Sequence, residues 1–340
     1  MYVFNALVST AFCMVSEFQF LENLKSKYPV EKIGDDCAVL PKDENTDMLL
    51  TTDMLVEDID FRLDWTTPEF LGHKTLAVSL SDIAAMGGTP IWSMLSIGVP
   101  ELLWKTDFID RFYAGWHSHA KRACVELVGG DISRTPDKFV IDSIIGGSVP
   151  KGNAIMRSGA LVGDAIVVTD HVGGAAGGLK LLESGRRLGL DLASWEEVLL
   201  SIHLKPWPQT RTGIYLETHK LAHSMIDISD GLAADLQHLC EASRVGARLY
   251  ADKIPLNLNL HNLSNTFEGR LNMGLNGGED FQLLFTLSTD KIPELTSNMV
   301  GDIDPGLFNV IGEVTAYAGT IELVIDSHTQ DLRPKGYRHF

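Results

Sequence analysis

The residues best suited to chemistry in this chain are carboxylates that stand beside glycine or hydroxyl residues. Most of them follow short apolar runs, so we expect them at strand ends, where loops bring functional side chains to a common site. A lone Gly-Asp pair is ordinary turn chemistry, but six such segments in one chain favour a shared site. The six segments are Gly34-Asp35-Asp36, Thr51-Thr52-Asp53, Ser81-Asp82, Gly129-Gly130-Asp131, Asp227-Ile228-Ser229-Asp230-Gly231 and Gly277-Gly278-Glu279-Asp280.

Carboxylates that converge need positive counter-charge. Two unit charges about 4 Å apart repel by roughly 4 kcal/mol at an effective dielectric constant near 20, so several could not stay ionised together. The chain has 28 Lys and Arg residues against 45 Asp and Glu residues, so basic partners for all six segments are not expected. Divalent cations supply such charge, and Mg²⁺ binds carboxylates together with substrate phosphates. The hydroxyls of Thr51 and Thr52 would add neutral oxygen ligands.

Asp82 is the most informative of these acidic residues. It lies on a helix expected over residues 68–86, where Leu71, Thr75 and Val78 form one stripe at helical spacing and Asp82 is the next position on it. A carboxylate on a buried stripe is costly unless it is paired or binds a metal ion. The stripe therefore predicts that Asp82 is a metal ligand.

Two further features could contact phosphate. The glycine-rich turn over residues 173–178 follows an expected strand and opens a helix. Its backbone N–H groups could bind a phosphate, or its glycines could serve close helix–strand packing; no Walker A lysine follows it. Arg157 is either a phosphate contact or a surface arginine. No Ser/His/Asp or Cys/His set suggests nucleophilic catalysis.

Composition excludes some classes of partner. The formal net charge of −17 argues against nucleic acid, whose phosphate backbone needs a basic surface. No stretch approaches the roughly 20 apolar residues of a membrane span. None of the four cysteines stands in a C-x-x-C spacing, so we expect buried thiols of a cytoplasmic protein, not a zinc or redox site. The cysteines are Cys13, Cys37, Cys124 and Cys240.

The elements that must position these residues are strands and helices without a strict βαβ rhythm. This pattern favours an α+β fold of two halves over one doubly wound sheet. We expect helices over 17–28, 68–86, 106–124, 194–203 and 230–244, and strands over 37–40, 48–52, 91–99, 125–128, 139–149, 165–169 and 281–287.

The predicted organisation is an N-terminal extension over residues 1–15, a first domain over 16–150 and a second over 151–340. The boundary falls at Pro150-Lys151-Gly152-Asn153. The extension is apolar, but it lacks the basic region and cleavage site of a signal peptide. An extra strand or an upstream start codon is the alternative reading.

In their order along the chain, these segments resemble those of the thiamine-monophosphate kinases, which share a superfamily with aminoimidazole ribonucleotide synthetase. The resemblance extends from Ser16 to Phe340 and rests on all six acidic segments with their flanking residues. It also includes the tail Lys335-Gly336-Tyr337. Each piece is weak alone, but the whole set in this order is specific.

The resemblance implies a cytoplasmic homodimer with an aminoimidazole ribonucleotide synthetase-like fold, whose N-terminal sheet domain dimerises. It implies transfer of the γ-phosphoryl group of ATP to thiamine monophosphate, giving thiamine diphosphate, with several Mg²⁺ ions and no acid or base residue. By motif match, the metal ligands would be Asp36, Thr51, Thr52, Asp53, Asp82, Asp131, Asp227 and Asp230. ATP would contact Gly130, Asp131, Arg157 and Ser229, and the acceptor would contact Asp60, Glu279 and Pro334.

Two of these positions depart from the family pattern. Asp60 stands where the family usually has a histidine, and Pro334 where it usually has a tryptophan. Both belong to the expected acceptor site, whereas the expected metal and ATP residues all match. Two alternatives therefore stay open: a related ATP-dependent enzyme with another small-molecule substrate, and a non-catalytic Mg-ATP-binding module.

Overall fold

The computed structural model describes residues 17–30, 32–297, 304–334 and 336. Residues 34–337 form one compact unit, and Met1–Ile33 together with Arg338–Phe340 form another. In the second of these units the structure describes helix α1 (Glu17–Lys27), which the spacing of apolar residues predicted. The predicted extension over residues 1–15 lies outside the described residues.

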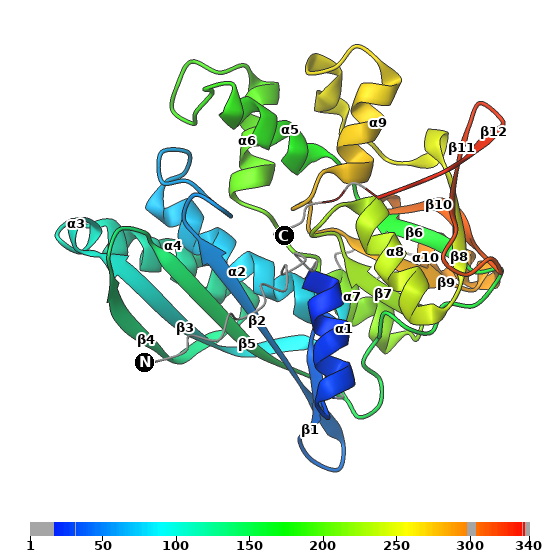
Figure 1. Cartoon of the computed structure of the whole chain (residues 1–340), viewed down its shortest axis with the longest axis horizontal. Helices are drawn as coiled ribbons and strands as arrows, with labels where there is room; N and C mark the ends of the chain where they lie inside the picture. Colours follow the sequence, from blue (N-terminus) through cyan, green and yellow to red (C-terminus); the bar gives the residue numbers. More distant parts are fainter. Residues whose placement is uncertain (1–16, 31, 298–303, 335, 337–340) are drawn as a thin grey trace, which may run out of the picture. The chain divides into compact units, whose positions relative to one another are not determined.

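The larger unit contains two sheets, and the first has the strand order β1-β2-β5-β3-β4 (Figure 1). All neighbours pair antiparallel except β3 and β4, which are parallel and therefore need a crossover connection. Helices α3 (Glu101–Trp104) and α4 (Phe108–Ala123) form this connection. The strands are β1 (Ala38–Pro41), β2 (Thr46–Val56), β3 (Thr89–Pro100), β4 (Glu126–Thr135) and β5 (Val140–Pro150).

Helix α2 (Pro68–Ala85) packs on this sheet and against α4. Thr67 caps it by accepting the N–H of Phe70, and proline occupies its first position. The two helices cross closely because residue 115 of α4 is glycine: a Cβ atom there would lie 1.9 Å from the carbonyl oxygen of Glu69 in α2. Nearly every side chain of α2 is buried, so any charged group on this helix must find a partner.

The second sheet has the strand order β12-β11-β8-β10-β6-β9-β7. Every residue of β6, β7 and β9 is buried, as in sheets that are covered on both faces. The strands are β6 (Ala165–Thr169), β7 (Ser224–Asp227), β8 (Gly246–Tyr250), β9 (Leu283–Leu287), β10 (Phe308–Thr315), β11 (Ile321–Ile325) and β12 (His328–Asp331). The helices are α5 (Gly174–Glu183), α6 (Ser194–Leu204), α7 (Thr210–Thr218), α8 (Leu232–Ser243), α9 (Phe267–Asn276) and α10 (Ile292–Ser297).

Two apolar cores lie against the second sheet. One contains α8, through Leu232 and Leu236, and the other contains α7, through Leu216. The C-terminal turn of α2 belongs to the α7 core through Ala84 and Ala85, while the rest of α2 packs in the core of the first sheet. Helix α2 therefore joins the two sheets and carries Asp82 to their junction.

The predicted α+β class with two halves is confirmed by the two sheets and their helices. The predicted boundary at residues 150 and 151 falls between β5 and β6, although residues 34–337 form one compact unit. Helices α7 and α9 were not predicted, because both are short and their apolar residues follow no long periodic pattern.

Two expectations about the positions of elements were wrong. Asp53 and Asp131 lie inside β2 and β4 and not at their ends, because both strands continue to pair through these residues. The helix expected over residues 230–244 is α8, which begins two residues later, at Leu232 after Gly231. It ends at Ser243, where Arg244 takes a left-handed conformation.

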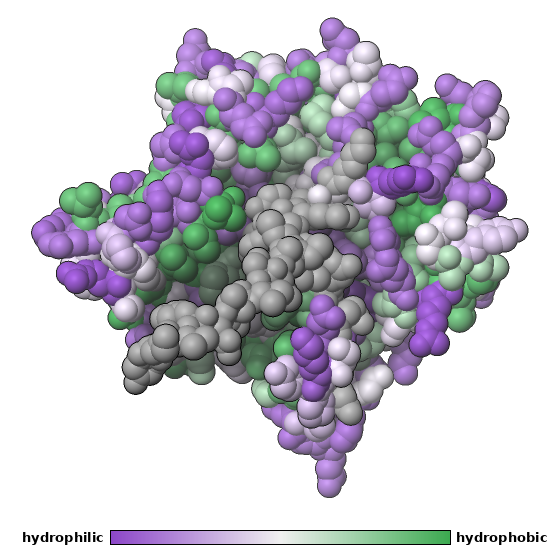
Figure 2. Space-filling view, viewed as in Figure 1, coloured by the Kyte–Doolittle hydropathy of each residue, from purple (hydrophilic) through white to green (hydrophobic). Residues whose placement is uncertain are grey.

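The described surface mixes hydrophilic residues with smaller hydrophobic patches (Figure 2). No described helix combines the length and the apolar character that a membrane crossing requires. Cys37 and Cys240 are buried free thiols, as predicted, but Cys124 is exposed because it ends α4 in a left-handed conformation. Cys13 lies outside the described residues.

Candidate active site

Three predicted carboxylates meet where the two sheets join. Asp36, Asp82 and Asp227 each place one oxygen so that all three oxygens lie within 4.8 Å of one another. Asp36 precedes β1, Asp82 is in the last turns of α2, and Asp227 ends β7. Residues far apart in the chain thus form one acidic cluster, as the shared pattern of the acidic segments predicted.

Burial and mutual repulsion disfavour ionisation of this cluster. Burial, with the charge of Asp36 next, raises the pKa of Asp227 to about 8, and burial raises the pKa of Asp53 to about 6. Burial and then the charges of Asp53 and Asp227 raise the pKa of Asp82 well above its usual value. Asp53 therefore belongs to the same electrostatic group, although it comes from the middle of β2.

Hydroxyl groups donate hydrogen bonds to this group of carboxylates. Thr51 Oγ1 donates to Asp82 Oδ2, and Ser81 Oγ donates to Asp227 Oδ2 at 2.6 Å. Thr52 Oγ1 instead donates to Asp142 Oδ1 at 2.6 Å. Asp142 was not predicted, because it lies near the start of β5 without a neighbouring glycine.

Arg157 is the cation that the described residues bring to this cluster. Its Nη2 atom donates to Asp36 Oδ1 at 2.6 Å, and its backbone N–H donates to Asp35 Oδ1 at 2.7 Å. Burial alone would lower the pKa of Arg157, but the charge of Asp36, followed by Asp227 and Asp35, raises it above its usual value. One guanidinium cannot neutralise the four carboxylates of the group, so further positive charge is needed for all of them to be ionised. The four are Asp36, Asp53, Asp82 and Asp227.

The donor set fits a hard divalent cation. Asp36 Oδ2 and Asp53 Oδ2 are buried oxygens that have no hydrogen-bond partner among the described residues. Buried polar atoms normally have one, so each orphaned oxygen calls for an explanation. Carboxylate and hydroxyl oxygens are ligands that Mg²⁺ accepts. An ion would satisfy both orphaned atoms and offset the burial and repulsion that raise the pKa values of the cluster.

The remaining predicted metal and ATP residues lie outside this cluster. Gly130 and Asp131 are on the exposed strand β4, where a Cβ atom on residue 130 would lie 2.0 Å from the Leu95 carbonyl oxygen. Ser229 and Asp230 follow β7 directly, in the loop that leads from Asp227 to α8. The roles predicted for these four residues stay predictions.

The loop after Asp227 is held by a carboxylate that was not predicted. Asp235 Oδ2 accepts the backbone N–H groups of Asp230 and Gly231, at 3.2 and 3.0 Å. Gly336 lies beside the same loop, since a Cβ atom on it would lie 2.8 Å from the Asp230 carbonyl oxygen. Pro334, two residues earlier, is half-buried.

Asp60 shapes the loop that carries it. Its Oδ2 atom accepts the backbone N–H of Val56 at 2.8 Å, so the side chain closes the turn that follows β2. The described contact is with the chain itself, and the predicted role of Asp60 in acceptor binding stays a prediction.

Glu279 forms contacts that the sequence did not predict. Its carboxylate lies 2.8 Å from Lys74 Nζ of α2 and 3.1 Å from His203 Nδ1 of α6. Lys74 could have been found by the argument applied to Asp82, since it is also a charged residue on a helix whose other side chains are nearly all buried.

The glycine-rich turn is already occupied by a carboxylate of the chain. Asp280 accepts the backbone N–H groups of Gly173, at 2.5 Å, and Ala175, at 2.9 Å. The turn also packs closely, since a Cβ atom on Gly178 would lie 2.3 Å from the Leu199 carbonyl oxygen. Of the two functions left open for this turn, close packing is observed. The N–H groups of Gly173 and Ala175, which could have bound a phosphate, already donate to Asp280.

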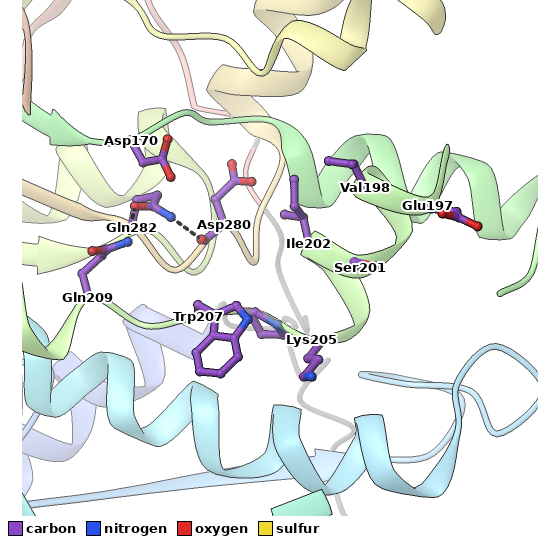
Figure 3. Close-up of a pocket in the computed structure, with 11 residues that line it drawn as sticks. Asp170, Glu197, Val198, Ser201, Ile202, Lys205, Trp207, Gln209, Asp280 and Gln282 are labelled. Carbon is purple, nitrogen blue, oxygen red and sulfur yellow. Dashed lines mark hydrogen bonds between the residues drawn. The ribbon is translucent and has the colours of Figure 1, made fainter. Parts of the chain in front are cut away.

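A hollow of about 470 Å³ lies between α6 and the segment that carries Asp280 and Gln282 (Figure 3). Asp280 and Gln282 line it together with Gln209, Trp207 and residues of α6. Gln282 Oε1 accepts hydrogen bonds from Thr169 Oγ1 and from Gln209 Nε2. The Gln282 side chain therefore has partners within the chain, and these bonds anchor the segment that carries Asp280 and Gln282.

The chain matches two family models, described as the N-terminal domain of AIR synthase related protein over residues 34–149 and its C-terminal domain over residues 162–325. It is 37% identical over 316 residues to the thiamine-monophosphate kinase of Escherichia coli (strain K12), with 91% of each chain covered. It is 34% identical to that of Buchnera aphidicola subsp. Acyrthosiphon pisum, covering 97% of this chain and 99% of that protein. A solved structure described as AaThiL complexed with AMPPCP and TMP superposes with a TM-score of 0.83 at 31% identity, covering 96% and 97%.

Proposed function

The chain belongs to the family of thiamine-monophosphate kinases, and from this premise we propose that it phosphorylates thiamine monophosphate with ATP to give thiamine diphosphate. The observation that carries the proposal is the buried acidic cluster with its two orphaned oxygens, at the junction of the two sheets. The related complex holds AMPPCP, an ATP analogue, together with TMP, which is consistent with one site for both reactants.

Several Mg²⁺ ions would be held by the predicted acidic and hydroxyl residues. Asp36, Asp53, Asp82 and Asp227 form the centre, and Thr51, Thr52, Asp131 and Asp230 complete the proposed set. Bound there, the ions would neutralise the phosphates of both reactants and the charge that develops during transfer. The acceptor is a phosphate monoester, mostly dianionic at pH 7, so no general base is required.

The chain's own cation would take part in nucleotide binding. Arg157 lies half-buried beside Asp36, and its Nε atom is a buried donor that has no hydrogen-bond partner among the described residues. A guanidinium with an unused donor suits a phosphate oxygen. We assign Arg157 to ATP together with Gly130, Asp131 and Ser229, and the acceptor to Asp60, Glu279 and Pro334.

One assay tests this function. Purified protein is incubated with Mg-ATP and thiamine monophosphate, and thiamine diphosphate is separated by chromatography. We expect product that depends on time and enzyme and that disappears when EDTA replaces Mg²⁺. Thiamine in place of the monophosphate is the control for the acceptor. Protein that binds Mg-ATP but forms no product would exclude this acceptor and favour a relative with another substrate, as Asp60 and Pro334 allow.

We also propose that the protein is a homodimer that pairs through its first sheet. Strand β4 is an exposed edge, and it carries Leu127, Val128 and Ile132. A long, apolar, exposed edge strand is prone to pair with another chain. A cytoplasmic location is part of the same proposal, because the described cysteines are free thiols.

Ile132→Glu should weaken this dimer. The side chain is 51% exposed at the edge of the sheet, and a glutamate there would be buried without a partner in the dimer. We expect a dissociation constant raised about a hundredfold or more, measured by analytical ultracentrifugation. Leu258→Glu, at an exposed leucine outside the first sheet, is the matched control. An unchanged dimer in Ile132→Glu would place the interface elsewhere.

A further inference from the structure

Lys74 is a buried cation of α2 whose charge is directed at one carboxylate. Its Nζ atom lies 2.8 Å from Glu279 Oε1, and its side chain is 4% exposed. An ammonium group is costly to bury unless it is paired, so this position requires the ion pair. The pair links the helix that carries Asp82 to the segment that carries Glu279.

His203 lies beside the second oxygen of the same carboxylate. Its Nδ1 atom is 3.1 Å from Glu279 Oε2, within hydrogen-bonding reach, although no aligned hydrogen bond to it forms among the described residues. Burial, with the charge of Lys74 next, lowers the pKa of His203 to about 4, so the ring is neutral near pH 7. Each oxygen of Glu279 thus faces one nitrogen, from two different helices.

The backbone of this segment is fixed as well. Glu279 has a φ of 65° and Phe281 a φ of 48°, both in the left-handed region that few non-glycine residues adopt. The N–H of Glu279 donates to the Ser229 carbonyl oxygen at 2.8 Å. The backbone beside Glu279 is anchored, because Asp280 accepts the N–H of Gly173 and Gln282 accepts Thr169 Oγ1. Gln282 also donates to the Asp280 carbonyl oxygen, as Figure 3 shows.

We propose that Lys74 and His203 are positioning residues, which hold the Glu279 carboxylate in a single orientation toward the acceptor. The inference rests on the proposed function, in which Glu279 contacts the thiamine part of thiamine monophosphate. The Glu279 side chain is 29% exposed, so part of it stays accessible to a ligand. Although burial alone would raise the pKa of Glu279, the charge of Lys74 lowers it, so the group is a carboxylate near pH 7.

A positioning role differs measurably from a merely structural one. If Lys74 and His203 act through Glu279, their loss raises the KM for thiamine monophosphate and leaves the KM for ATP unchanged. Loss of a structural ion pair between α2 and the second sheet would instead lower stability and affect both substrates. Two groups that act through a third are also non-additive with it in a double-mutant cycle.

The experiment compares Lys74→Met, Glu279→Gln and the double variant with wild type, using steady-state kinetics for both substrates. We expect Lys74→Met to raise the acceptor KM about tenfold and the ATP KM less than about twofold. In the Glu279→Gln background, Lys74→Met should change the acceptor KM by less than about twofold. Lys291→Met, which removes an exposed ion pair with Glu294, is the matched control.

His203 provides the second arm, which leaves the Lys74 ion pair intact if Lys74→Met does not fold. His203→Leu should raise the acceptor KM, and His203→Asn, which keeps an N–H donor near Glu279, should restore most of it. Either of two results would overturn the inference. One is an acceptor KM that His203→Leu leaves unchanged; the other is a Lys74→Met change in the acceptor KM that is equally large in the wild-type and Glu279→Gln backgrounds. Wild-type protein that forms no thiamine diphosphate would instead overturn the proposed function.

Discussion

Asp82→Asn should abolish turnover and at the same time make the metal-free protein more stable. Asp82 lies in the acidic cluster with Asp36 and Asp227, so its loss removes one ligand and one negative charge. Weaker Mg²⁺ binding should lower kcat/KM by about a thousandfold or more, which corresponds to ~4 kcal/mol. Without metal, fewer buried like charges should raise the free energy of unfolding.

Initial rates at saturating Mg-ATP and thermal unfolding in EDTA measure the two effects. The matched control is Asp47→Asn, since Asp47 is also a buried aspartate of this unit but accepts the backbone N–H of Gly152 at 2.8 Å. An asparagine keeps that acceptor, so we expect near wild-type turnover and stability. Wild-type turnover in Asp82→Asn would contradict the metal cluster.

The second large effect should be the pH dependence of the metal-free protein between pH 6.5 and 8. Burial, with the charge of Asp36 next, raises the pKa of Asp227 from 3.8 to about 8. In this range the folded protein binds a proton that the unfolded chain has lost, so the free energy of unfolding should fall as pH rises. The pKa of Asp82 is also raised, so Asp82 likewise makes the free energy of unfolding fall as pH rises.

Three buried histidines set the lower limit of this window. Burial lowers the pKa of His73 to about 3 and that of His119 and of His203 to about 4. Below pH 6.5 the unfolded chain therefore binds more protons at these residues, and their contribution to stability increases with pH. Above pH 6.5 this contribution fades as the unfolded chain loses its remaining histidine protons, and the carboxylates determine the slope.

Mg²⁺ should reverse the fall in the free energy of unfolding that the metal-free protein shows above pH 6.5. Cation binding favours ionised ligands and releases their protons, so stability at pH 8 should rise on adding Mg²⁺ more than at pH 6.5. Calorimetry in buffers of different ionisation enthalpy would measure the released protons, and denaturant unfolding in EDTA and in Mg²⁺ would measure stability. Metal-free protein that becomes more stable from pH 6.5 to 8 would disagree with these pKa values.

Residue type and spacing were sufficient to predict the centre of the candidate site. Asp36, Asp82 and Asp227 each carry a local signal, namely a glycine neighbour, a buried helical stripe or an apolar run before the acid. The α+β class followed in the same way from the mixture of periodicities. These signals are local because strand ends and helix faces are defined within a few residues.

Long-range pairs could not be predicted from the sequence. Lys74 meets Glu279, and Thr52 meets Asp142, only because the two sheets and neighbouring strands bring them together. Glycine was misleading at Gly130, where it indicated a turn. In the structure it allows close contact with Leu95 within a continuing strand. Polar side chains inside exposed or functional strands break the alternation on which strand prediction depends.

The distance along the chain between the halves of the acidic cluster has a consequence for synthesis on the ribosome. Ser81 and Asp227, which share a hydrogen bond, are separated by 146 residues. At about 5–20 residues per second, the second half of the cluster emerges roughly 7–30 seconds after the first. During that interval Asp36, Asp53 and Asp82 lack Asp227, and for about its first half they also lack Arg157. The nascent N-terminal part therefore has to keep these acids hydrated or protonated, and the cation site can form only late in translation.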